Sequence, residues 1–121
     1  MTDKLAVGKR GEDEAVRFLK KNGYKIIERN YRCRHGELDI VAMDGDIISF
    51  IEVKTRATDR FGTPAGSVDE RKQRHITKAS MTYMAEKGLY DTPARFDVVS
   101  VELSGDGFKT SVIKDAFEAA E

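Results

Sequence analysis

The sequence predicts an α/β fold in which helices flank a mixed central β-sheet of about five strands. Three observations lead to this prediction: apolar residues recur at helical spacing near the N-terminus, an Asp-Gly turn joins two apolar segments, and a capping-box pattern opens a second helix. The predicted order is helix, three strands, helix, two strands. With 121 residues, 40% of them hydrophobic, the chain can bury one core but not two, so we expect a single domain over residues 1–121.

The first predicted helix spans residues 3–22 and ends at Gly23, a residue that suits the left-handed position after a helix. Spacing its residues at 100° gathers the apolar positions on one stripe, and Glu12 falls near the centre of that stripe. A carboxylate is unexpected on a packing face. Gly8 and Gly11 beside it lower the helix propensity further, although a partly exposed helix acid would also explain Glu12.

Five segments are predicted to be strands. They are residues 24–31, 37–43, 47–54, 95–103 and 108–113. The second and third are expected to form a hairpin through Asp44-Gly45. Both are apolar on both faces, which is typical of central strands that are covered by helices on each side.

The second predicted helix follows a long loop at residues 55–66. Ser67-Val68-Asp69-Glu70 is a capping-box pattern, which opens a helix that runs to about Lys87 and is followed by Gly88. A loop of this length in a compact domain is often functional, and its arginines would suit a lid that contacts a substrate. An ordinary surface loop explains the same residues equally well.

The charge of the chain gives little support to nucleic-acid binding by itself. It has 21 basic and 21 acidic residues, so it lacks the strong positive charge of many nucleic-acid binders. Basic residues do cluster at positions 29–35 and 71–75. Charge alone favours ordinary solvated faces for both clusters, and local basic patches are the alternative.

Cysteine and histidine usage limits the kind of metal site that the chain can build. Cys33 is the single cysteine, which excludes an internal disulfide and a cysteine-cluster zinc site. His35 and His75 match no short metal motif, so any metal is expected to be bound by oxygen. The sequence has no apolar run that could span a membrane and no secretory signal, so we expect a cytoplasmic protein with no membrane partner.

The hairpin is predicted to bring acids and a lysine together. Alternation along the third strand puts Glu52 and Lys54 on one face. If the turn is the two-residue Asp44-Gly45, Asp39 lies diagonal to Glu52, about 7–8 Å away at the Cα atoms. A three-residue turn would place the two acids on opposite faces of the sheet.

Burying these charged side chains on an apolar sheet face costs free energy unless their charges are paired. A divalent cation would pair with the carboxylates. Mg²⁺ or Mn²⁺ prefers carboxylate and water oxygens, so Asp39 and Glu52 are the predicted ligands. Lys54 would then orient water or neutralise charge on a phosphodiester, and Glu12 would add a further contact. The alternative is an exposed ion pair on an edge strand, worth under about 1 kcal/mol.

The same residues, in order, resemble a known superfamily. A helix acid at Glu12, Gly36-Glu37-Leu38-Asp39 before an apolar strand, and Glu52-Val53-Lys54 after a hairpin resemble the restriction-endonuclease-like (PD-(D/E)xK) nucleases. The chain looks closest to the small bacterial YraN-type family, which is similar to archaeal Holliday-junction resolvases. The likeness covers nearly the whole chain and includes Asn30-Tyr31-Arg32, although Leu38 stands where many such nucleases have proline.

This resemblance implies a restriction-endonuclease-like core and a Mg²⁺-dependent (or Mn²⁺-dependent) endonuclease that acts on DNA, with branched or damaged DNA as candidate substrates. It assigns catalytic roles to Glu12, Asp39, Glu52 and Lys54, with Asp39 and Glu52 as metal ligands. The residues expected to contact DNA are Arg32, Arg34, Arg56, Lys72 and Gln73. Gln73 is equally well explained as a surface glutamine with no role at the site.

Other functions remain open from the sequence. One is a nucleic-acid-binding module in DNA repair or recombination that does not cleave. Another is a metal-stabilised interaction protein with no nucleic-acid role. Because resolvases act as dimers on two-fold-symmetric junctions, a homodimer is also considered, with Val98, Val99 and Val101 or the C-terminal strand as its interface.

Overall fold

The computed structural model describes residues 4–57, 68–105 and 107–120. Two helices and five strands follow one another in the predicted order. They are α1 (Lys4–Lys21), β1 (Lys25–Cys33), β2 (Gly36–Asp44), β3 (Ile47–Ala57), α2 (Glu70–Lys87), β4 (Ala94–Ser104) and β5 (Gly107–Phe117). The predicted α/β class and element order are therefore confirmed.

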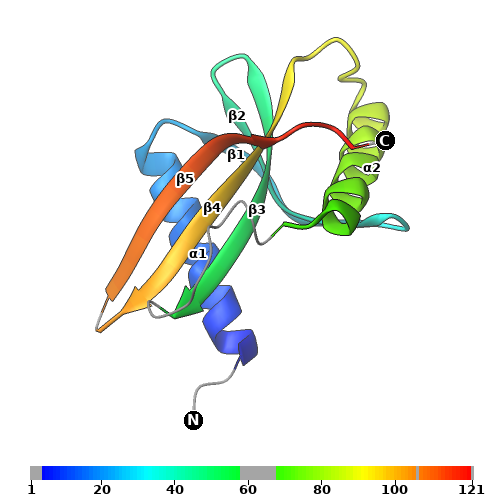
Figure 1. Ribbon diagram of the computed structural model, residues 1–121. Coiled ribbons are helices and arrows are strands. Elements are labelled where there is room, and N and C mark those ends of the chain that lie inside the picture. Colours follow the sequence, from blue (N-terminus) through cyan, green and yellow to red (C-terminus); the bar gives the residue numbers. More distant parts are fainter. Residues whose placement is uncertain (1–3, 58–67, 106, 121) are drawn as a thin grey trace.

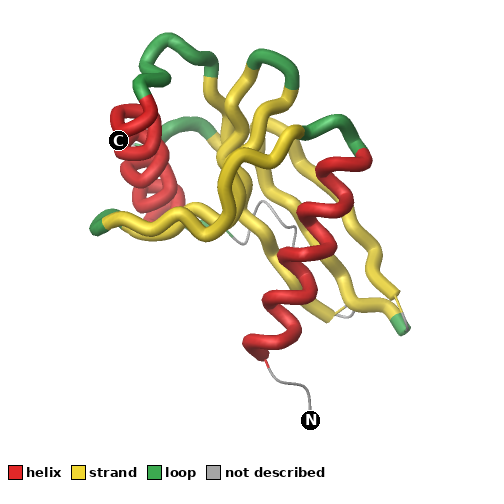
Figure 2. Tube along the Cα trace, turned by 180° about the vertical axis from the view of Figure 1, so that it is seen from behind, coloured by secondary structure: helices red, strands yellow, loops and turns green. Residues whose placement is uncertain are grey.

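The five strands form one mixed sheet in the order β1-β2-β3-β4-β5. β3 and β4 are parallel, and the other neighbouring strands are antiparallel. A parallel pair needs a crossover connection, and α2 lies in the crossover from β3 to β4. Figure 1 shows α1 on one face of the sheet and α2 on the other, and Figure 2 shows the same arrangement from behind.

Each helix covers its own apolar cluster. On one face of the sheet, Leu19 of α1 packs in a cluster with Ile40 of β2. On the other face, Tyr83 of α2 packs in a cluster with Val41, the next residue of β2. Neighbouring strand residues thus point to opposite cores, which is why the hairpin strands are apolar on both faces.

This packing corrects one expectation about assembly. Val98, Val99 and Val101 of β4 are each 0% exposed, because they belong to the two cores. They are therefore not available as a dimer interface. The C-terminal strand β5, at the edge of the sheet, is the part of that expectation that the structure leaves open.

Several element boundaries differ from the sequence prediction. β3 continues past Lys54 because it pairs with β4 as far as Ala57 and Leu103. β5 continues past Ile113 to Phe117, beyond a bulge in its pairing with β4. The N-cap of α2 is Asp69, whose side chain accepts a hydrogen bond from the Lys72 N–H, so the predicted capping box is wrong in register. The rest of the predicted loop, residues 58–67 with Ser67, lies outside the described residues.

The turn of the β2–β3 hairpin also differs from the prediction. Asp44 pairs with Ile47, so the two turn residues are Gly45 and Asp46, with Gly45 at φ 63°. The predicted register is therefore wrong by two residues. Regular alternation would keep Asp39 and Glu52 on one face after a shift of two residues. Leu38 and Ile40 belong to different core clusters, however, so alternation is interrupted at Asp39.

A buried polar network joins strands on the hairpin side of the candidate site, around Asp97, which pairs with Ile51. The fully buried Asp97 carboxylate accepts hydrogen bonds from Tyr24, Ser49 and Arg95 and from the backbone N–H of Asp115. Burial raises its pKa, but the Arg95, Ser49 and Asp115 donors outweigh burial and hold the pKa below the usual range. These bonds link the start of β1 with β3, β4 and β5.

Helix α1 approaches the sheet most closely at Gly11. A Cβ at this position would lie within 2.8 Å of the Thr55 Cβ on β3 and clash with the rest of that side chain. From the sequence, Gly11 is only a residue of poor helix propensity. The structure shows that the close approach of Thr55 requires a glycine at this position.

No described helix is long and apolar enough to cross a membrane.

The two glycines of α1 should respond in opposite ways to alanine. Gly11→Ala is expected to lower the free energy of unfolding by about 1–3 kcal/mol, because the methyl group forces α1 away from Thr55. Gly8→Ala is the matched control, since a Cβ at position 8 would meet no atom within 4 Å. It should raise stability by about 0.5–1 kcal/mol through helix propensity alone. Urea denaturation of both variants measures the difference, and equal effects would contradict the packing argument.

Candidate active site

Asp39 lies where β2 separates from β3. The ladder between these strands runs from Asp44 and Ile47 to Ile40 and Ile51. Beyond it, the Val53 N–H donates a hydrogen bond of 2.9 Å to the Asp39 carboxylate instead of to a backbone carbonyl. The Asp39 side chain thus accepts a hydrogen bond that a β2 backbone carbonyl would accept in a regular ladder. This bond fixes the carboxylate against the backbone of β3.

Glu52 lies next along β3 and is only 6% exposed. Its Oε1 is 3.6 Å from the Lys54 Nζ and 3.5 Å from the Lys72 Nζ. Lys54 comes from the same strand, whereas Lys72 comes from the first turn of α2, whose start is fixed by the Asp69 cap. A nearly buried carboxylate is therefore held between two ammonium groups from different elements.

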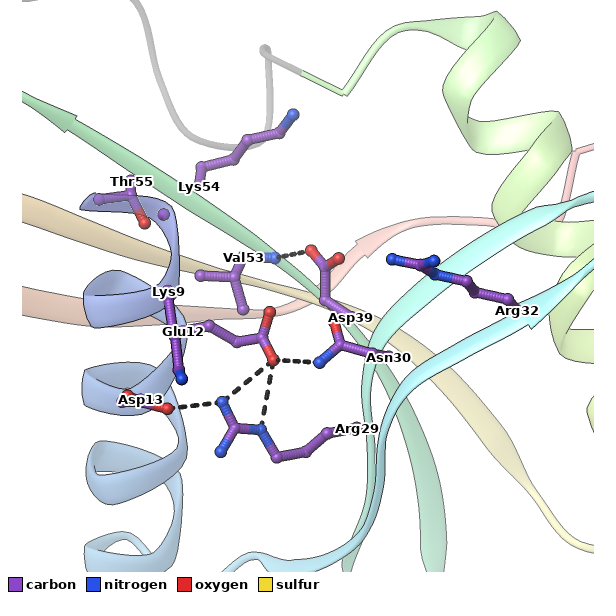
Figure 3. Close-up of a pocket in the computed structure, with 11 residues that line it drawn as sticks. Lys9, Glu12, Asp13, Arg29, Asn30, Arg32, Asp39, Val53, Lys54 and Thr55 are labelled. Carbon is purple, nitrogen blue, oxygen red and sulfur yellow. Dashed lines mark hydrogen bonds and ion pairs between the residues drawn. The ribbon is translucent and has the colours of Figure 1, made fainter. Parts of the chain in front are cut away.

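Glu12 reaches the site from α1. Its Oε1 accepts hydrogen bonds from Arg29, at 3.1 and 3.2 Å, and from the Asn30 side-chain amide, at 3.0 Å. Arg29 also binds Asp13 at 2.7 Å. Two consecutive residues of β1 thus hold the helix acid in place (Figure 3).

Asn30 has an unusual backbone that allows this contact. It is a non-glycine residue at φ 55°, and it has no partner in the β1–β2 register, in which its neighbours Arg29 and Tyr31 both pair with β2. Asparagine tolerates the left-handed region better than most residues. The irregularity lies beside Asp39, so both strands that flank β2 deviate from regular pairing at the candidate site.

Glu12, Asn30 and Asp39 border one groove of about 890 Å³, whereas Glu52 is not among its lining residues. Its charged lining consists of four basic side chains (Lys9, Arg29, Arg32 and Lys54) and three acidic ones (Glu12, Asp13 and Asp39). Figure 3 shows the Glu12 carboxylate directed at Asn30 and Arg29 and the Asp39 carboxylate directed at the Val53 N–H, with the Arg32 guanidinium pointing toward Asp39. Helix α1 forms one wall of the groove and β1, β2 and β3 form the other.

The pKa of Asp39 is raised to about 7. Burial is the main cause, and the negative charges of Glu52 and Glu12 add to it, whereas the Val53 N–H and Lys72 oppose it. This carboxyl therefore keeps its proton to a higher pH than an ordinary aspartate does. A cation placed beside it would favour the charged form.

The donor set fits a hard divalent cation. Among the described residues, no three histidine, cysteine, aspartate or glutamate side chains are grouped so that they could hold a metal together. Asp39 and Glu52 offer two carboxylates, and Mg²⁺ is commonly held by one or two carboxylates with water completing its shell. The residues thus fit Mg²⁺ or Mn²⁺ better than zinc, which usually takes four protein ligands in structural sites.

The predicted DNA-contacting residues do not all share this site. Arg32 lines the groove, with its side chain 78% exposed and its Nε 3.7 Å from the Glu37 carboxylate. Lys72 contacts Glu52. Arg34 contacts His35 in the β1–β2 turn, and Gln73 donates to the Val68 carbonyl, so it fastens the segment before α2. Neither of these last two lines the groove, and Arg56 lies on β3 just beyond its lining residues.

Four groove residues with charged or amide side chains were not predicted as site residues: Lys9, Asp13, Arg29 and Asn30. A signal was present for two of them, because Arg29 belongs to the basic cluster and Asn30 to the motif that carries the resemblance. What the sequence did not show is that both bind Glu12.

Neutralising Asp39 should stabilise the metal-free protein at alkaline pH. An aspartate whose pKa is raised on folding binds its proton more tightly in the folded state, so stability falls as pH rises from 3.8 to about 7. Asp39→Asn keeps an acceptor for the Val53 N–H and removes this penalty. We expect a gain of about 1–2 kcal/mol at pH 8 that shrinks toward pH 5.

Urea denaturation in EDTA at pH 5 and pH 8 measures this effect. Asp46→Asn, at the exposed hairpin turn, is the matched control and should change little at either pH. A loss of stability in Asp39→Asn at pH 8 would show that the carboxylate contributes more as a hydrogen-bond acceptor than it costs as a buried charge.

Comparison with known proteins places the chain in a family. Residues 11–101 match the model of the uncharacterised protein family UPF0102. The chain is 50% identical over 120 residues to a UPF0102 protein of Syntrophus aciditrophicus, covering 99% of this chain and 94% of the relative. It is 48% identical over 115 residues to one of Geobacter metallireducens, covering 95% and 94%.

A search of solved structures matches Pyrococcus furiosus SfsA in complex with Ca²⁺, at 14% identity and a TM-score of 0.41. That match covers 93% of this chain and 62% of SfsA. The family-level part of the resemblance is thus confirmed, whereas none of these descriptions names a nuclease. The identities to these relatives over nearly the full length, together with the family match, show that the chain belongs to the uncharacterised protein family UPF0102.

Proposed function

We propose that this protein is a metal-dependent endonuclease of the restriction-endonuclease-like superfamily that hydrolyses phosphodiester bonds of DNA, with branched or damaged DNA as its preferred substrate. The observation that carries the proposal is the placement of Asp39. Its partly buried carboxylate is fixed to the β3 backbone at Val53, between the two residues, Glu52 and Lys54, that complete the acid and acid-x-lysine pattern.

The chemistry follows from the residues around this point. Asp39 and Glu52 would hold Mg²⁺ or Mn²⁺, which supplies Lewis-acid activation of water and of a phosphate oxygen when bound. Lys54, with its side chain 28% exposed, can face a phosphate and offset the negative charge that develops on it. Glu12 is held by Arg29 and Asn30 at the groove and can orient water at the same centre.

The groove supports a polyanionic substrate despite the neutral chain. Its four basic residues outnumber its three acidic ones, and Arg29 already neutralises part of the charge of Glu12 and Asp13. Phosphate contacts of this kind give affinity that is independent of sequence and falls with salt. A substrate recognised by its shape, such as a junction, would need no base-specific contacts in this groove.

A second function has a specific observation in its favour. Both Glu12 and Glu52 are already paired with basic side chains, Glu52 with Lys54 and Lys72. A site whose acids are neutralised by the protein itself has less need of a cation. A nucleic-acid-binding module that does not cleave, in DNA repair or recombination, is therefore the alternative.

Cleavage assays distinguish the two functions. Labelled duplex, single-stranded and four-way-junction DNA would be incubated with the protein in Mg²⁺, Mn²⁺ or EDTA. We expect cleavage that needs the metal and that falls by at least about a hundredfold in Glu52→Gln and Lys54→Met, because each removes a charge from the reacting centre. Glu118→Gln and Lys78→Met, at exposed positions, are the matched controls and should cut normally.

Each other outcome has a clear meaning. Salt-dependent DNA binding without cleavage in any metal would favour the binding module. If the protein neither binds nor cleaves DNA, both proposals are contradicted. Sizing the protein with and without a junction would show whether a homodimer forms, which remains a prediction of the resemblance.

A further inference from the structure

Gly8 occupies a helical position in α1 that nothing in the described chain explains. Glycine lowers the stability of a helix, so a glycine there normally answers a local need. The backbone of Gly8 is helical, and an ideal Cβ built on it would meet no atom within 4 Å. The residue is exposed, and alanine would fit without any rearrangement of the chain.

Six of the other seven described glycines have such a need, and Gly107, which lies outside the helices, is the exception. Gly11 is required by the close approach of Thr55. Five more adopt positive φ angles, which side chains rarely tolerate: Gly23, Gly36, Gly45, Gly88 and Gly105. Gly107 opens β5 directly after the turn from β4. Gly8 differs from all of these because it lies within a helix and has neither a positive φ nor a close neighbour.

What Gly8 does have is a place in the wall of the groove. It lines the groove together with Lys9, and it lies one helical turn before Glu12, on the same side of α1. The missing side chain therefore leaves space directly beside the candidate catalytic acid. That space lies along the groove whose other basic residues include Arg32 and Lys54.

Resting on the proposed function, we infer that the phosphodiester backbone of the nucleic acid crosses α1 at Gly8 on its way to Asp39. A backbone that passes over a helix needs a position without a side chain, as close backbone approach generally does. Lys9 lies next to this crossing, and Arg32 and Lys54 provide positive charge along the groove beyond it. The occupant is thus a chain of phosphates rather than a compact ligand.

Adding bulk at position 8 tests this crossing. Gly8→Ala and Gly8→Leu would be compared with wild type for binding of a labelled four-way junction and a duplex in Ca²⁺, a cation that often supports binding without cleavage, over a range of salt concentrations. Gly8→Leu should weaken binding by at least about tenfold, because its side chain occupies the space that the backbone needs. Gly8→Ala should have a smaller effect in the same direction.

Two measurements separate this effect from a loss of structure. The melting temperature of both variants should equal or exceed that of wild type, because the substitutions improve helix propensity without a clash. Ala85→Leu, at an exposed position of α2 outside the groove, adds similar bulk with no change of charge and should bind DNA normally.

The outcomes distinguish this inference from the proposed function. Wild-type-like binding by a stable Gly8→Leu variant would overturn the crossing at Gly8, whatever the protein cuts. Wild-type protein that binds DNA but cuts none would contradict the nuclease, and the Gly8 comparison would still decide where the strand passes. Wild-type protein that binds no nucleic acid would overturn both.

Discussion

The contact between α1 and β3 at Gly11 and Thr55 is the constraint on which the candidate site depends. The Thr55 side chain packs directly against the helix backbone there, because Gly11 has no side chain of its own. This brings the next residue, Glu12, within hydrogen-bonding distance of Arg29 and Asn30 on β1. If α1 stood further from the sheet, Glu12 would no longer reach these partners, and the groove would lose the wall that faces Asp39.

The site also depends on two departures from regular strand pairing. Asp39 replaces a backbone acceptor for the Val53 N–H, and Asn30 turns away from β2 in a left-handed conformation. Each weakens the sheet locally, and burial beside Glu52 raises the pKa of Asp39 as well. The network around Asp97 supplies satisfied hydrogen bonds on the hairpin side of the site. The molecule is therefore regular and well paired away from the groove and strained beside it, as functional sites often are.

Sequence patterns predicted the fold well because periodicity is local. The order of elements follows from these patterns even though the hairpin turn differs by two residues. Alternation alone does not place Asp39, because Leu38 and Ile40 on either side of it lie in different cores. Contacts between distant segments were not predictable in this way. The binding of Arg29 and Asn30 to Glu12, the approach of Thr55 to Gly11 and the pairing that extends β3 to Ala57 all depend on tertiary packing. The resemblance predicts Gln73 and the basic cluster predicts Arg34 as DNA contacts, but their side chains bond locally.

We propose that Asp39 and Glu52 form a binding site for a divalent cation. Diffraction from crystals grown with Mn²⁺, measured at the manganese absorption edge, tests it most directly because the anomalous signal locates the ion itself. We expect one anomalous peak between the carboxylates of Asp39 and Glu52, and we expect this peak to disappear in Asp39→Asn. No peak there at saturating Mn²⁺, with Glu52 still held by Lys54 and Lys72, would contradict it.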